Sequence, residues 1–248
     1  MRHTVILFTL LLSAALCFTV EAQDKKLTAG QAKAFYEKAD KALNEAWAAA
    51  KAALPESVFT KLKEDQKMWG AYRDHLARSP MYTGAEADGQ LALDAPEYLE
   101  AAAYLAEDRT KWLKGLVREW GTDETLTGEW SDSHGGTVQV VEQDGRLYFI
   151  VECVRGTTSH NGSLAGIAAW NQTIGWFSDK GRDHAKEGET NLSFILRDRK
   201  LEIIGANTGE YHGVRAYFDG EYVKTGTLGA KQQAKVVKSA KTGELPEE

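Results

Sequence analysis

Four histidines are the side chains best suited to metal binding or acid–base chemistry, and all lie in the second half of the chain. They are His134, His160, His184 and His212. Zinc sites place such ligands at short spacings like His-x-His or His-x3-His, and no two of these four are so spaced. The sequence also contains no nucleophile-elbow motif, phosphate-binding loop or zinc-protease helix. We therefore expect no metal, no cofactor and no catalytic residue, so the chain is predicted not to be an enzyme.

A second group of chemically capable side chains recurs at helical spacing in the first half. Gln66, Trp69, Tyr72 and Arg73 fall within two turns, on neighbouring faces of one expected helix. The Trp and the Tyr bury large surfaces, and Arg73 is expected to pair with a carboxylate on a neighbouring helix. We interpret these four residues as the structural motif that holds the helices together, in preference to a direct partner contact.

Three amphipathic helices must position that group. Apolar residues recur at i, i+3 and i+4 within residues 35–47, 58–76 and 94–116. Thr28 is the expected N-cap of the first helix, and Pro55 suits the first turn of the second. Residues 94–97 carry a capping signal for the third helix, and a loop with Pro80 and Gly84 precedes it. This pattern predicts an antiparallel helical hairpin plus one more helix.

The same segments resemble the lysozyme inhibitor LprI-like N-terminal domain family. The matching stretches read LNEAW at 43–47, LKEDQKMWGAYRD at 62–74 and AEDRTKWL at 106–113. The resemblance covers about residues 28–119 and implies a helical module that binds a lysozyme. Members of the family usually carry cysteines near the start of the first helix, after the YRD and in the third helix. This chain has none there, which puts functions that depend on such staples in doubt.

From residue 126 onward, short runs of β-branched and aromatic residues alternate with turn signals such as Asp-Gly. The runs are residues 126–130, 137–142, 147–154, 164–169, 173–178, 191–196, 201–204, 214–218 and 221–224. They predict an antiparallel all-β sandwich or barrel of about eight strands. This half resembles the β domain that often follows LprI-like helices, through GEW at 128–130, HNG at 160–162 and YHGV at 211–214. The fold class is therefore α+β with two domains.

Two polar, glycine-flanked loops of the β half are the expected partner-binding surface. They span residues 156–163 and 210–215. A lysozyme cleft holds two carboxylates, so an inhibitor would present cationic, hydroxyl or amide groups from a rigid loop. The candidates are Arg155, Ser159, His160, Asn161, Tyr211, His212 and Arg215. For any one of them, a role in an ordinary turn is the simpler interpretation.

The first 22 residues have the layout of a secretory signal. A basic start at Arg2 precedes an apolar run, and Val20-Glu21-Ala22 offers small residues for cleavage. The run is marginal for a stable membrane span, and a retained signal anchor or a lipid on Cys17 is the alternative. Removal of the signal leaves Cys153 alone, so no intramolecular disulfide is possible. We expect export to the periplasm or beyond the cell.

The expected organisation is a signal peptide (1–22), a helical domain (23–120), a β domain (121–227) and a polar tail (228–248). The tail has few large apolar residues, and we expect it to be disordered. The net charge is −6, and residues 121–227 carry 10 basic and 16 acidic side chains. That balance disfavours nucleic acid and favours a basic partner.

Taken with the resemblance, the sequence predicts an exported cell-envelope protein that binds a basic c-type lysozyme or another envelope protein. The alternatives are an envelope assembly protein, a barrel that binds a small ligand or wall fragment, and a hydrolase.

Overall fold

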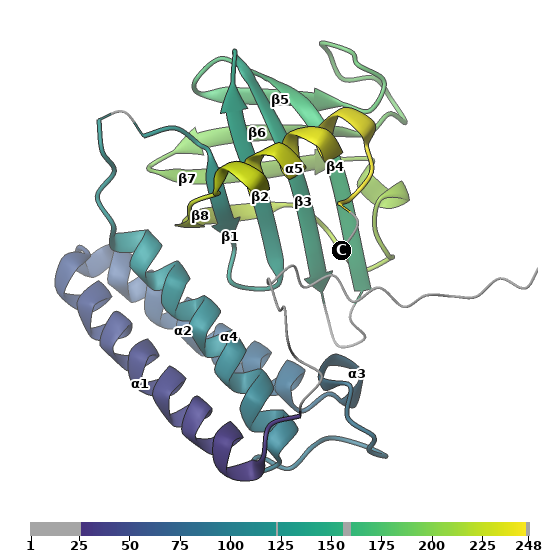
Figure 1. Cartoon of the computed structure of the whole chain (residues 1–248). Coiled ribbons are helices and arrows are strands. Elements are labelled where there is room, and N and C mark those ends of the chain that lie inside the picture. The colour runs from purple at the N-terminus through teal and green to yellow at the C-terminus, as the bar shows by residue number, and fades with distance from the viewer. Residues whose placement is uncertain (1–25, 123, 156–159, 247–248) are drawn as a thin grey trace, which may run out of the picture.

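The computed structural model describes residues 26–122, 124–155 and 160–246, and divides them into a helical part and a barrel (Figure 1). The helices are α1 (Ala29–Ala53), α2 (Glu56–Ala77), the short α3 (Pro80–Thr83), α4 (Pro96–Val117) and α5 (Ala230–Thr242). The strands are β1 (Gly128–Ser131), β2 (Gly136–Gln143), β3 (Arg146–Arg155), β4 (His160–Trp170), β5 (Ile174–Ser178), β6 (Asn191–Arg197), β7 (Lys200–Ala206) and β8 (Gly220–Gly226). This arrangement confirms the predicted α+β class with two domains. The described part of the chain contains no helix both long and apolar enough to cross a membrane.

The helical domain begins at the predicted cap. The Thr28 hydroxyl accepts a hydrogen bond from the Gln31 amide, and the Gln31 side chain accepts one from the Thr28 amide, which is a capping box. Two other end signals were wrong. Pro55 occupies the N-cap position of α2 rather than its first turn, and α4 begins after Ala95 without a side-chain cap.

The helices pack around α4. The most extensive contact is between α1 and α4, and α2 also packs on α4. α1 and α2 meet mainly near their tight connection, where the Trp47 and Phe59 rings lie 4.9 Å apart. The predicted hairpin is therefore bound together by the third long helix rather than by direct contact along its length.

The eight antiparallel strands pair in sequence order, and β1 closes the barrel on β8. Full closure leaves no sheet edge unpaired. Inward-facing side chains fill the interior, and among them the Phe149 ring contacts the rings of Phe177 and Phe194 at 5.2 and 4.8 Å. An eight-stranded barrel has just enough room for such side chains.

The ninth expected strand, residues 214–218, is not a strand. The chain between β7 and β8 runs through a short 3-10 turn (Thr208–Glu210) and then along the start of β4, where His212 bridges Gly162. Ala216 and Phe218 are buried in the barrel core while Tyr217 is exposed. The alternating burial resembles that of a strand, but this segment belongs to no ladder and instead packs its apolar side chains into one end of the barrel.

The expectation of a disordered tail was also wrong. Residues 230–242 form α5, which lies across β2, β3 and β4 on the outside of the barrel (Figure 1). Its Val236 packs with Leu228 against Val141, Ile150 and Ala165. These few apolar residues suffice because the barrel wall supplies the other half of the small core.

Candidate partner-binding site

The motif of the helical domain forms a buried polar network. Arg109 of α4 is fully buried, donates from Nε to the Gln66 amide oxygen at 2.9 Å and forms an ion pair with Asp65. Its guanidinium lies over the rings of Trp69 and Trp112, 5.5 and 4.3 Å from their centroids. Burial lowers the pKa of Arg109, and Asp65 opposes that effect. The arginine that joins neighbouring helices is thus Arg109, which the sequence motif did not single out for that role.

Arg73 does not pair with a neighbouring helix, as we had expected. Its Nε and Nη2 both donate to one carboxylate oxygen of Asp74, at 3.0 and 2.8 Å. The same oxygen accepts a hydrogen bond from the Tyr98 hydroxyl of α4 at 3.1 Å. A second link between α2 and α4 therefore runs through Asp74.

Tyr72 connects the helical domain to the barrel. Its ring lies 5.5 Å from that of His134, in the turn between β1 and β2. A Cβ placed on Gly135 would lie 2.8 Å from the Tyr72 hydroxyl. Burial raises the pKa of Tyr72 well above its ordinary value, so the phenol stays neutral. Of the four motif residues, this one contacts the other domain.

The two domains also share a core where α4 meets β8. Val223 of β8 is buried among the apolar residues of the helical domain. Beside it, Lys224 forms an ion pair with Glu124 at 2.9 Å and donates to the Thr125 carbonyl at 2.8 Å. Arg118 bonds the same carboxylate and, with Lys224, lowers the pKa of Glu124 to about 2. Separating the domains would expose Val223 and break the ion pair between Arg118 and Glu124.

Residues 160–163, the described part of the first expected loop, form the start of β4 and lie beside the second expected loop, residues 210–215. The Ser163 amide donates to the Tyr211 carbonyl, and the Gly213 amide donates to the Asn161 carbonyl, both at 2.9 Å. His160 begins β4 within the same group. The structure thus brings His160, Asn161, Tyr211 and His212 together, while Ser159 lies outside the described residues.

His212 fixes this surface through both ring nitrogens. Nδ1 lies 2.9 Å from the Gly213 carbonyl oxygen, and Nε2 lies 2.8 Å from Oγ1 of Thr208. Because a carbonyl only accepts, Nδ1 carries the proton in the neutral ring and the Thr208 hydroxyl donates to Nε2. The ring also meets the edge of Phe218 at 5.3 Å. His212 therefore positions the loop.

A turn projects from this fixed base. The Ala216 amide donates to the Gly213 carbonyl at 2.9 Å, so residues 213–216 form a β-turn with Val214 and Arg215 at its tip. Val214 is 97 % exposed, Arg215 is exposed and Tyr217 beyond the turn is 49 % exposed. Val214 and Tyr217 were not among the expected site residues. Their alternation with Ala216 and Phe218 was visible in the sequence, but we assigned it to a strand.

Arg155 does not belong to the exposed surface, which corrects the expectation that it offers a cation to a partner. It is 4 % exposed, forms an ion pair with Asp132 and donates from Nη1 to the His134 carbonyl at 2.7 Å. Its guanidinium lies over the Tyr217 ring, 4.4 Å from the centroid. Although burial opposes it, Asp132 holds the pKa of Arg155 above its ordinary value. The charge of Arg155 is paired with Asp132 inside the end of the barrel. Arg215 is exposed and can offer a cation to a partner.

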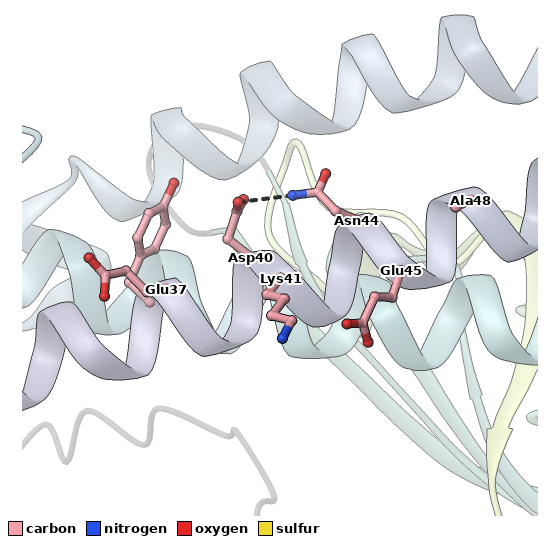
Figure 2. A pocket seen from close by; sticks show the side chains of 7 residues that line it. Glu37, Asp40, Lys41, Asn44, Glu45 and Ala48 are labelled. Atoms are coloured by element: carbon pink, nitrogen blue, oxygen red, sulfur yellow. Dashed lines mark hydrogen bonds between the residues drawn. The ribbon is translucent and has the colours of Figure 1, made fainter.

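Other groups of side chains among the described residues are weaker candidates for a binding site. No three His, Cys, Asp or Glu side chains of the described residues are grouped as metal ligands. Cys153 is buried, and burial raises the pKa of its thiol. A shallow, open depression runs along α1, lined by Tyr36, Glu37, Asp40, Lys41, Asn44, Glu45 and Ala48 (Figure 2). Its charges are mixed, and Asp40 is already bonded to Asn44 at 3.0 Å.

Comparison with known proteins identifies the first half of the chain. Residues 20–113 match the family described as Lysozyme inhibitor LprI. No curated protein and no solved structure matches the chain significantly. The match covers the helices that carry the Gln66, Trp69, Tyr72 and Arg73 motif and ends within α4. The helical domain of this chain is therefore similar to the LprI lysozyme inhibitor family over residues 20–113.

Proposed function

We propose that this chain is an exported cell-envelope protein that binds a basic lysozyme and inhibits it. The similarity of the helical domain to the LprI family supports inhibition as the activity, and the signal-like first 22 residues support a periplasmic or extracellular location. The net charge of −6 would steer a basic enzyme toward the protein. Barrel interiors that bind ligands are open, whereas this one is filled with side chains, which argues against a ligand inside it.

We place the inhibitory contact at the Gly213–Ala216 turn, and this turn is the observation that carries the proposal. A retaining glycosidase holds two carboxylates about 5–5.5 Å apart. A guanidinium can bond a carboxylate through two donors, so Arg215 has the chemistry to meet such a cleft. Because His212 and the backbone bonds to β4 hold the base of the turn, little conformational entropy is lost on binding. His160 and Asn161 lie next to it and supply further polar groups.

The test is the lysis of a cell-wall suspension by a c-type lysozyme, titrated with residues 23–248. We expect stoichiometric inhibition that weakens as salt is added. R215A should weaken inhibition by about 10- to 100-fold, the loss expected when a charge-assisted hydrogen bond is removed from an interface. R146A is the matched control, because Arg146 is also an exposed arginine and lies at the opposite end of the barrel.

The possible results test lysozyme inhibition and the role of the Gly213–Ala216 turn separately. If the folded wild-type protein does not inhibit at large molar excess, the inhibitor proposal fails for c-type enzymes. If the wild type inhibits and R215A inhibits equally well, the function stands and the turn is the wrong surface, which leaves the helical domain as the contact. Isolated domains are unsuitable for this test, because Val223 would lose its place in the shared core.

A further inference from the structure

The outward face of α5 differs in charge from the rest of the barrel. Val236, Ser239 and Ala240 face the barrel and are buried. The opposite face carries Lys231, Lys235, Lys238 and Lys241, all exposed, and we name these four residues the lysine ridge. The helix contains no acidic residue, while residues 121–227 have an acidic excess of six. The helix is thus purely basic beside a barrel whose net charge is acidic.

The lysine ridge is straight and unneutralised. Lys231, Lys235 and Lys238 follow one another at i, i+4 and i+7, which places them in a row about 10 Å long on one side of the helix. None of the three forms an ion pair with another described residue. Lys241 is 5.9 Å from the centroid of the Tyr148 ring, still on the barrel surface. Unpaired like charges repel one another by a few tenths of a kcal/mol per pair, so the row is not explained by the stability of the helix.

The shape and composition of the ridge select the kind of partner. α5 lies on the outside of the barrel wall (Figure 1), so the ridge is convex and a flat surface can meet all of its lysines together. Between the lysines the outward residues are small, Ala230 and Ala234. Protein interfaces are centred on buried aromatic or arginine anchors, and this face offers none. It also offers nothing apolar to insert between lipid tails.

We propose that the lysine ridge docks the protein on the anionic lipid headgroups of a membrane surface. The contact is electrostatic, reversible and separate from the Gly213–Ala216 turn, so it does not depend on lysozyme binding. In this orientation the lysine ridge faces the membrane. Each lysine at an anionic membrane surface strengthens binding by about fivefold, from a contribution of about 1 kcal/mol.

The experiment measures co-sedimentation of residues 23–248 with vesicles at low salt. One set of vesicles contains phosphatidylcholine with phosphatidylglycerol, and the other contains phosphatidylcholine alone. We expect binding only to the first set, lost as salt shortens the screening length. The triple variant K231Q/K235Q/K238Q should bind about 100-fold more weakly. The control triple K38Q/K41Q/K61Q removes three exposed lysines from α1 and α2 and should bind like the wild type.

Three results would overturn the proposal. If the wild-type protein does not bind the anionic vesicles at low salt, the proposed membrane docking is refuted. Equal losses in the two triple variants mean that only the total charge matters. Binding of a soluble polyphosphate that depends on the ridge, without vesicle binding, assigns the ridge to a polyanionic chain instead of a membrane. Circular dichroism of both variants checks that they are folded.

Discussion

Gly115 is the position where a single methyl group tests the contact between the domains. It lies on α4, against β8. A Cβ at this position would overlap the carbonyl oxygen of Lys224 and lie 2.9 Å from Cγ1 of Val223. The carbonyl belongs to a strand paired with β1 and β7, so it cannot turn aside. G115A therefore forces α4 and β8 apart or distorts one of them.

The expected size follows from two opposing effects. Overpacking of this kind costs about 1–3 kcal/mol, while replacing a helical glycine by alanine gains about 1 kcal/mol. We expect G115A to lower the free energy of unfolding by up to about 2 kcal/mol. Gly70 in α2 is the matched control, because a Cβ there meets nothing within 4 Å. G70A should raise the free energy of unfolding by up to about 1 kcal/mol.

Urea denaturation followed by circular dichroism and by tryptophan fluorescence measures both variants. Trp120 and Trp130 lie beside Lys224 and report on the junction. The two variants should shift the midpoint in opposite directions, and thermal melts should differ by about 2–4 °C for each kcal/mol. If G115A and G70A are stabilised alike, the close packing of α4 on β8 does not exist in solution, and the argument for one shared core falls with it.

Three further predictions concern buried charge and the last helix. R109A should lower the free energy of unfolding by about 3–5 kcal/mol, because it removes the buried partner of Asp65 and Gln66; a loss below 1 kcal/mol in urea denaturation would contradict the network. E124Q should destabilise the protein by about 1–2 kcal/mol above pH 4.5, with the difference fading as the pH falls toward 2, since the folded pKa of Glu124 is depressed; equal differences at pH 7 and pH 2 would refute this. V236D should release α5 to proteolysis by burying an unpaired charge, whereas K235D, on the outer face, should leave it protected.

Much of the fold could be predicted because the signals were local. Thr28 and Gln31 cap α1 with their own side chains, and nothing distant is needed to fix that helix end. The β runs were recognisable because Asp144-Gly145 and similar turns separate segments that alternate inward and outward. Closure into a barrel instead of a sandwich depends on β1 meeting β8, almost a hundred residues away, and no local pattern reports that.

The wrong predictions share one cause. Whether each of these side chains is buried depends on residues that are distant from it in the sequence. Phe218 has a strand-like neighbourhood, but the space it fills lies at the end of a barrel built by other residues. Val236 seemed too isolated to order the tail, yet Val141 and Ile150 complete its core. Arg155 and Arg215 look alike in the sequence, and only the position of Asp132 makes one an internal ion pair and the other a surface cation. Gly213 marked a turn in the sequence, and residues 213–216 form one, while the choice between Arg155 and Arg215 as the exposed cation needed the fold.

These distant contacts also account for how the described part of the chain holds together without a disulfide. Cys153 is the one cysteine among the described residues, and it is free. A disulfide stabilises mainly by restricting the unfolded chain, so its loss must be offset by interactions in the folded state. The Arg109 network joins α2 to α4 through Gln66 and Asp65. Val223 then ties that bundle to a closed barrel. In this protein the barrel is therefore part of what keeps the helical domain folded.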